Sequence, residues 1–182
     1  MRALVDAALA VLRRRGAAGL TVAEVLTEAG LSTRAFYRHF QSKDELVLAV
    51  YEDEAQRRNA DLAVRLDRAR SPRAAVETWI DETLALGFDP RRATRTRVLL
   101  REGARLQADF PAEFAAIVSG AVAPLETALV ALPSPDPERD AWSVYAVTWE
   151  LVQQKLRGAP TTRADARAHA LRFCLDGLGG TA

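Results

Sequence analysis

Hydrogen-bonding and cationic side chains gather between residues 33 and 43 of the 182-residue chain. The group consists of Thr33, Arg34, Ala35, Tyr37, Arg38, His39 and Lys43. Arginine pairs in a bidentate manner with guanine, a small apolar side chain packs on a thymine methyl group, and Tyr, His and Lys reach phosphate oxygens. These residue types predict contacts with double-stranded DNA, with Thr33, Arg34 and Ala35 at base edges and Tyr37, His39 and Lys43 at phosphates. Arg38 is either a further contact or a solvated surface residue.

Two short helices joined by a tight turn would hold these side chains outward. Thr21 begins the first helix, with Glu24 at capping-box spacing, and Gly30 suits a left-handed turn. Ser32 would cap the second helix, which we expect to extend to about Phe40. Apolar residues supply the inner faces of the pair: Val22, Val25, Leu26, Ala29, Leu31, Phe36 and Phe40. Segment 21–40 thus predicts a helix-turn-helix, and Thr21 joins the predicted DNA-binding residues because free amides at a helix start favour a phosphate.

The rest of the chain also shows helical periodicity, and no run of alternating β-branched residues is found. We expect an all-α protein of about nine helices, the first over residues 2–15. Proline-led starts are expected at Pro72, Pro90, Pro111 and Pro137, and a last start at Thr162. The expected domains are a DNA-binding domain over 1–50, with helix-turn-helix 21–40, and an α-helical bundle domain over 51–182 for ligand binding and dimerisation.

Composition narrows the possible function classes. The net charge is +1, but residues 1–50 carry seven basic and five acidic side chains, a local surplus of +2. Cys174 is the only cysteine, which excludes an intramolecular disulfide and agrees with a reducing cytoplasm. We expect a cytoplasmic protein with no signal peptide, no membrane-spanning segment and no cofactor or metal. Phosphate-loop, paired-histidine and nucleophile-elbow motifs are not found, so we do not expect an enzyme.

Aromatic residues of the C-terminal part could line an apolar pocket for a small molecule. They are Trp79, Phe88, Phe110, Phe114, Trp142, Tyr145 and Trp149, and Thr83, Glu102 and Gln153 could add polar selectivity. Core or interface packing is the alternative, because Trp142, Tyr145 and Trp149 form one helical stripe. Six arginines between residues 91 and 105 are interpreted as a solvated helix surface. His169 is interpreted as a surface or interface residue, and Cys174 as a buried small hydrophobe.

Segment 1–50 resembles the tetracycline-repressor (TetR) family. The resemblance rests on Thr21, Ala29, Gly30, Ser32, Tyr37, Phe40, Lys43 and Leu46. It implies a homodimer that pairs through helices 8 and 9, a palindromic operator, and a C-terminal domain for an unknown, largely apolar small-molecule effector. It also implies a repressor that the effector releases from DNA. The alternative is a helical ligand- or partner-binding module that does not bind DNA.

Overall fold

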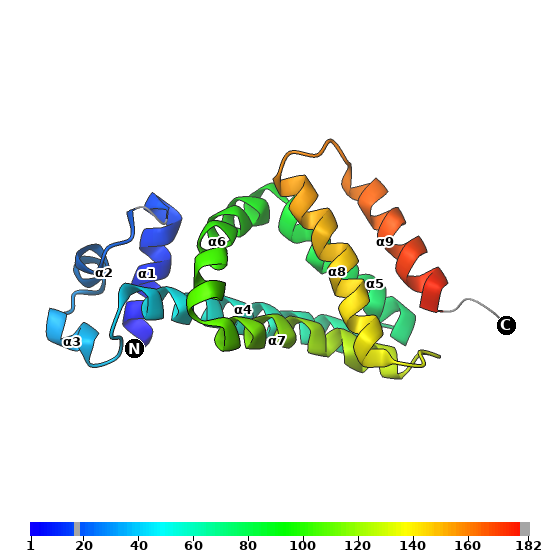
Figure 1. Cartoon of the computed structure of the whole chain (residues 1–182), viewed down its shortest axis with the longest axis horizontal. Coiled ribbons are helices and arrows are strands. Elements are labelled where there is room, and N and C mark those ends of the chain that lie inside the picture. Colours follow the sequence, from blue (N-terminus) through cyan, green and yellow to red (C-terminus); the bar gives the residue numbers. More distant parts are fainter. Residues whose placement is uncertain (17–18, 179–182) are drawn as a thin grey trace. The chain divides into compact units, whose positions relative to one another are not determined.

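The computed structural model describes residues 1–16 and 19–178, apart from the side chains of residues 98, 101, 102 and 176–178. Within this part the fold is all-α, as expected, with nine α-helices and no strand (Figure 1). The helices are α1 (Arg2–Arg15), α2 (Val22–Ala29), α3 (Thr33–Tyr37), α4 (Lys43–Asp67), α5 (Pro72–Phe88), α6 (Pro90–Asp109), α7 (Pro111–Val130), α8 (Pro137–Leu156) and α9 (Arg163–Leu178). The start and end of α1 and all four proline-led starts agree with the sequence.

Side-chain caps explain where several helices begin. Ser71 accepts a hydrogen bond from the Ala74 amide ahead of α5, and Asp136 accepts one from the Arg139 amide ahead of α8. Asp89 accepts one from the Arg92 amide at 2.9 Å, and this bond lowers the pKa of the Asp89 carboxyl. A proline within the first turn loses no helical bond, because the first amides of a helix have no partner inside it. Each Ser/Asp-Pro pair is therefore a local start signal.

The chain forms two compact units. Unit 1 comprises residues 1–57 and 98–117, and unit 2 comprises 58–97 and 118–182. The boundary expected after residue 50 divides the chain into two continuous segments. In the structure, residues 98–117 pack with the N-terminal helices instead of with the rest of the C-terminal segment. Leu106 of α6 is fully buried in the core of unit 1, and Leu99 and Ile117 pack against that core. A boundary read along the chain does not show this, because burial depends on contacts between segments far apart in sequence.

The core of unit 1 holds the N-terminal helices together. The apolar stripe of α1 is buried, namely Leu4, Val5, Ala8, Val11 and Leu12, and α1 packs against α2. Val25, Phe36, Phe40 and Leu46 complete the same core from α2, α3, the turn after α3 and the start of α4. Burying apolar side chains of this size contributes about 1.5–3 kcal/mol each. The short α2 and α3 are thus held by packing rather than by their own helix propensity.

Unit 2 is organised around α5, which packs against α8 and α9, while α8 also packs against α9 (Figure 1). Trp79 of α5 is 1% exposed, and its indole N–H donates to the Ala121 carbonyl at 3.0 Å. Cys174 of α9 is buried in this core, as expected, and burial raises the pKa of its thiol to about 11. A pKa this high leaves almost no reactive thiolate at neutral pH.

One expectation requires correction, because α7 is long and apolar enough to span a membrane by length and composition. Alanine and valine make the segment apolar without an uninterrupted run of large residues. Val122, Leu125 and Leu129 of this helix are buried in the core of unit 2. Core helices of globular proteins meet the same criterion, so length and composition alone do not assign α7 to a membrane.

Candidate nucleic-acid interface

The turn between α2 and α3 is set by three local features. Thr21 caps α2, since its Oγ1 accepts a hydrogen bond from the Glu24 amide at 3.2 Å. Gly30 ends α2 with φ of 63° and ψ of 33°, and its N–H donates to carbonyls of the last helical turn. Ser32 then caps α3 through the Ala35 amide at 3.3 Å. Only three residues, 30–32, separate the two helices, so the left-handed glycine sets the angle at which α3 leaves α2.

Three expectations about this segment were wrong in detail. Helix α3 ends at Tyr37 rather than near Phe40, because the following residues form a turn in which the His39 amide donates to the Phe36 carbonyl. Leu31 is 38% exposed rather than part of an inner face, because it lies in the turn, where helical periodicity does not apply. Glu24 binds the Arg15 guanidinium at 2.6 Å, so its carboxylate serves α1 rather than the second half of a capping box.

Two phenylalanines fix the outward face of α3. Phe36 is fully buried and Phe40 is 5% exposed, with their ring centroids 5.8 Å apart. The neighbouring Tyr37 ring meets Phe36 edge-on at 5.3 Å yet is 62% exposed. The buried pair holds the helix by its inner side, so Tyr37 projects outward from a rigid base.

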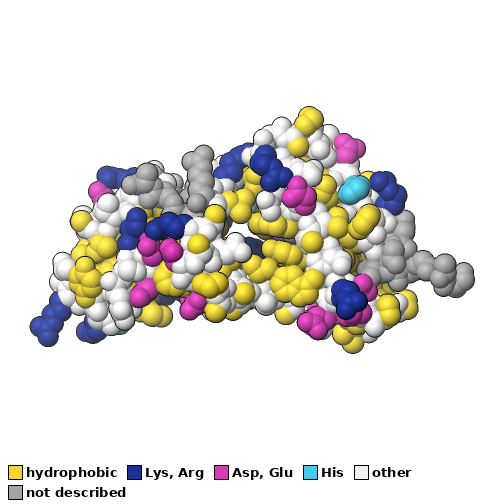
Figure 2. All heavy atoms as spheres, viewed as in Figure 1, with side chains coloured by type: hydrophobic (Ala, Val, Ile, Leu, Met, Phe, Trp, Pro, Cys, Tyr) yellow, Lys and Arg dark blue, Asp and Glu magenta, His cyan; other side chains and the backbone are white. Residues whose placement is uncertain are grey.

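The predicted contact residues are all at least partly accessible to solvent. Thr21, Thr33, Arg34, Tyr37, Arg38 and His39 are exposed, and Ala35 and Lys43 are partly exposed. A shallow depression beside α3 is lined by Ser32, Arg34, Ala35, Tyr37 and Arg38, and a second lies along α2 and the turn. Figure 2 shows Lys and Arg side chains projecting from the part of unit 1 that carries α3. The structure thus brings four of the side chains chosen from the sequence, Arg34, Ala35, Tyr37 and Arg38, around one depression.

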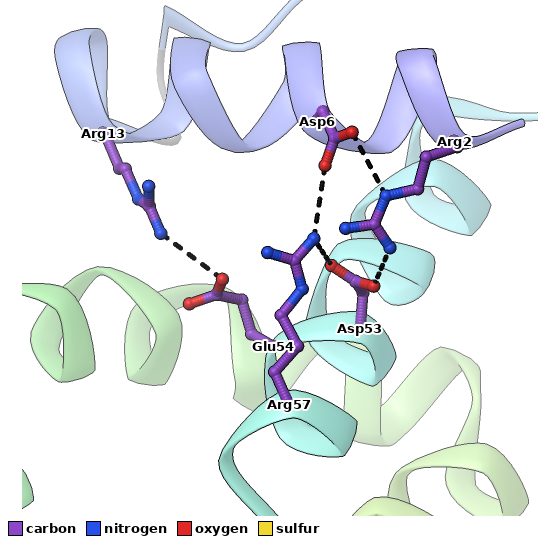
Figure 3. A network of polar contacts seen from close by, with 6 residues as sticks. All are labelled: Arg2, Asp6, Arg13, Asp53, Glu54 and Arg57. Atoms are coloured by element: carbon purple, nitrogen blue, oxygen red, sulfur yellow. Dashed lines mark hydrogen bonds and ion pairs between the residues drawn. The ribbon is translucent and has the colours of Figure 1, made fainter. Parts of the chain in front are cut away.

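The arginines of α1 do not add to that face, because carboxylates neutralise them. Figure 3 shows Arg2 bound to Asp6 at 3.1 Å and to Asp53 of α4, which Arg57 also binds at 3.0 Å. Arg13 binds Glu54 of α4 at 3.3 Å in the same view. The remaining two arginines of α1 pair with carboxylates of α2: Arg14 binds Glu28 at 2.8 Å and Arg15 binds Glu24. These pairs join α1 to α2 and α4.

The cations near α3 have a different environment. In the part of the chain that the structure describes, Arg34, Arg38 and Lys43 form no ion pair with a carboxylate. Desolvation lowers the pKa of His39, with smaller contributions from the N-terminal amino group and Arg38, so its imidazole loses its proton more readily than that of a free histidine. The small positive surplus of residues 1–50 is therefore located at α3 and the start of α4, where it can attract a phosphate backbone.

The start of α4 is bound by Arg105 of α6, a contact that the sequence did not predict. Ser42 caps α4 through the Glu45 amide at 3.1 Å, as expected, and the Glu45 carboxylate accepts from the Gln41 amide at 2.7 Å. Asp44 is held by Arg105 of α6 in a bidentate pair, with N–O distances of 2.9 and 2.6 Å. Since 61 residues separate the two, no local pattern could have paired them; Arg105 was interpreted as part of a solvated helix.

The aromatic residues proposed for ligand binding divide between the two units. Phe110 and Phe114 pack on the core of unit 1, whereas Trp79, Phe88, Tyr145 and Trp149 belong to the core of unit 2. On α8 the expected stripe is present: the Tyr145 ring lies 5.7 Å from Trp142, 6.2 Å from Trp149 and 6.4 Å from Trp79. Thr83 is buried and Gln153 partly exposed, while the side chain of Glu102 lies outside the described residues.

The remaining sequence interpretations can also be located. Of the six arginines of α6, Arg92 pairs with Glu82 of α5 at 2.8 Å. The Arg101 side chain is outside the described part. His169 is exposed on α9 and stacks on Phe173 with ring centroids 6.2 Å apart. Among the residues with described side chains, no group of three or more His, Cys, Asp or Glu could hold a metal ion.

The chain is all-α, and its helix-turn-helix exposes cations that have no carboxylate partner. These features are typical of helix-turn-helix DNA-binding proteins. Residues 4–50 match the profile of the family described as "Bacterial regulatory proteins, tetR family". The chain is 33% identical over 79 residues to the HTH-type transcriptional regulator BetI of Brucella anthropi, an alignment covering 43% of this chain and 41% of BetI. Segment 4–50 is therefore similar to the TetR family, and the resemblance stated from its motif residues is confirmed over this segment.

Two solved structures share the fold over nearly the whole chain. A TetR transcriptional regulator from Rhodococcus sp. RHA1 has a TM-score of 0.71 and 22% identity, covering 100% of this chain and 96% of that one. The transcriptional regulator FadR from Bacillus subtilis, in complex with stearoyl-CoA, has a TM-score of 0.68 and 12% identity, covering 100% and 99%. Proteins of this family are regulators rather than enzymes, in agreement with the expectation from the sequence.

Proposed function

We propose that the protein is a ligand-responsive transcriptional regulator, a repressor that a small-molecule effector releases from a palindromic operator. The observation that carries this proposal is the outward face of α3. Its cations Arg34 and Arg38, with Lys43 nearby, have no carboxylate partner among the described residues, although six other arginines of unit 1 do. A surface evolved only for packing or solubility would not require that separation. The proposed location is the cytoplasm, where operator DNA is found.

The proposed contacts follow from the position of each side chain. Thr33, Arg34 and Ala35 occupy the first turn of α3 and would reach base edges in the major groove. Arg34 would read guanine, and Ala35 leaves room for close approach. Tyr37, Arg38, His39 and Lys43 follow along the chain and would contact phosphates, together with Thr21 at the start of α2.

A homodimer through α8 and α9 would double these contacts. Both helices leave small residues exposed, Ala146 on α8 and Ala168 on α9, and Phe173 is 62% exposed. Small side chains allow two helices to approach closely, and an exposed phenylalanine gains by burial against a second copy. Two-fold symmetry would place the recognition helices about 34–36 Å apart, the spacing of successive major grooves on one side of a palindrome.

The effector site is proposed in the aromatic part of unit 2. Tyr145 is half-buried, and desolvation raises the pKa of its phenol, while the positive charge of Arg58 acts in the opposite direction. Hydrophobic atoms gather beside α8 in Figure 2. The buried Asn59 Oδ1 has no hydrogen-bond partner among the described residues, so an effector that combines a flat apolar body with a hydrogen-bond donor suits these groups. Trp79, Phe88, Trp142 and Trp149 would line this site, whereas Phe110 and Phe114 belong to unit 1 and are not part of it.

The effector would act by differential affinity. A ligand shifts a two-state protein only to the extent that it binds one state more tightly. The proposed lever is α4, since residues 43–57 belong to unit 1 and residues 58–67 to unit 2. The bound stearoyl-CoA shows that FadR, a regulator with the same fold, binds an acyl ligand, which supports a ligand-binding role for this chain.

Selection of bound sequences from a random DNA pool tests the proposal. We expect enrichment of a palindrome. In gel-shift titrations at several salt concentrations, Tyr37→Ala and Lys43→Ala should weaken binding to every sequence, and Lys43→Ala should also reduce the salt slope by about two, about one for each subunit of the dimer. Arg34→Ala should relax preference at one base position. The matched control is Arg68→Ala, an exposed arginine of unit 2, which should bind as the wild type does.

A helical ligand- or partner-binding module without DNA binding is the competing function. It predicts no enriched sequence and equal behaviour of the three α3/α4 variants and the control. Sedimentation of the purified protein tests the dimer separately. A monomer at micromolar concentration would contradict the α8 and α9 pairing.

A further inference from the structure

The ion pair between Asp44 and Arg105 lies where the protein is expected to meet DNA. Asp44 is in the first turn of α4, one residue after Lys43, so the two Cα atoms are about 3.8 Å apart. Its carboxylate stabilises the start of α4 through the helix dipole. The same charge is unfavourable beside a phosphate bound at Lys43, because the separation is within the Debye length of about 10 Å at 0.1 M salt.

Arg105 of α6 neutralises the Asp44 carboxylate from a distant part of the chain. Both terminal nitrogens of its guanidinium bind the Asp44 carboxylate, at 2.9 and 2.6 Å. The Arg105 side chain remains 44% exposed and that of Asp44 30% exposed, so the pair lies at the surface of unit 1 and is not buried in its core. A pair so exposed adds little to folding stability. Its position beside Lys43 gives it an electrostatic consequence for DNA instead.

We propose that Arg105 is a positioning residue for DNA binding, which acts by neutralising Asp44 beside the phosphate site at Lys43. The inference rests on the proposed function and extends it to α6, a helix assigned from the sequence to the ligand-binding domain. It explains why unit 1 includes residues 98–117: the DNA-binding surface is electrostatically complete only with this part of α6 in place. A fragment of residues 1–50 carries the recognition helix but leaves the Asp44 charge uncompensated.

The test compares four variants of the full chain on the selected operator: Arg105→Gln, Asp44→Asn, the double variant, and Arg105→Lys. Arg105→Gln should lower affinity about fivefold at low salt for a dimer with two half-sites, since a carboxylate about 8 Å from a phosphate in water costs roughly a factor of two per site. The deficit should shrink at about 300 mM salt. Asp44→Asn should bind at least as tightly as the wild type, and the double variant should return to within about twofold of it.

Arg105→Lys keeps the charge and should stay close to wild-type affinity. Arg91→Gln is the matched control, an exposed arginine of the same helix in unit 2, and should show no salt-dependent deficit. Urea unfolding of each variant separates folding from binding. A purely structural clamp predicts that Asp44→Asn and Arg105→Gln weaken DNA binding alike and that the double variant is no better. That result, or an Arg105→Gln variant equal to the control, would overturn the inference alone. A wild-type chain that binds no DNA would overturn both proposals.

Discussion

Replacing Gly30 by alanine tests the backbone geometry on which the presentation of α3 depends. Gly30 has φ of 63°, and a Cβ built there would meet no atom within 4 Å. Steric contact with the rest of the protein therefore contributes nothing, and the cost is that of a left-handed backbone in an L-residue. That cost is about 1–2 kcal/mol, partly offset by the reduced entropy of the unfolded chain, for a net loss of about 1 kcal/mol.

The same substitution elsewhere in unit 1 should have the opposite sign. Gly103 lies within α6, and a Cβ there would be 3.6 Å from Phe114 Cζ and 3.9 Å from Tyr51 Cε1, which are ordinary contacts. Glycine in a helix interior is less stable than alanine by about 0.5–1 kcal/mol. Gly103→Ala should therefore stabilise unit 1 by about that amount. Gly30→Asn provides a graded control, because asparagine adopts the left-handed region more readily than alanine does.

Urea unfolding followed by far-ultraviolet circular dichroism measures both effects. With m of about 1–3 kcal/mol/M, a change of 1 kcal/mol moves the midpoint by roughly 0.3–1 M. Tryptophan fluorescence follows the unfolding of unit 2 as a control, because all three tryptophans, at 79, 142 and 149, belong to that unit. Gly30→Ala with an unchanged midpoint, or Gly103→Ala with a loss as large as that of Gly30→Ala, would refute the assignment of the turn.

Three further outcomes follow from individual side chains. The pKa of His39 is lowered in the free protein, and a nearby phosphate would raise it; DNA binding should therefore take up a proton and tighten as pH falls from about 8 to about 5.5. His39→Gln should remove that part of the pH dependence, and an unchanged profile would place His39 away from phosphate. Cys174, with a pKa of about 11, should react with a thiol reagent only after unfolding, so rapid modification of the native protein would contradict its burial. Trp79→Phe should cost about 1–2 kcal/mol in urea unfolding, through the lost bond to the Ala121 carbonyl and the smaller ring, and a fully neutral effect would argue against that bond.

Local signals were sufficient for much of the candidate interface. Thr21, Gly30 and Ser32 determine a helix start, a left-handed end and a second start by interactions that span four residues or fewer, which a linear pattern contains. The spacing of Phe36 and Phe40 likewise indicates which side of α3 faces inward. Thr33, Arg34, Tyr37, Arg38 and His39 could be assigned to the outer face for that reason.

The same reasoning failed where periodicity ceased to apply. Leu31 was placed inward because it is apolar, yet it lies in a turn and remains exposed. Helix α3 was extended to Phe40 because that residue is buried, although burial there comes from a turn that packs on the core of unit 1.

The amino-acid sequence by itself determined the helical class of the chain, its helix starts and the residues exposed on α3, because these depend on caps and spacing within a few residues. Tertiary structure decided which charges remain available. Arg13, Arg14 and Arg15 are as basic as Arg34 in the sequence, but folding places them against carboxylates of α2 and α4 and leaves Arg34 unpaired. It also placed Arg105 beside Asp44 across 61 residues, since a salt bridge depends on distance in space, to which the sequence gives no local clue.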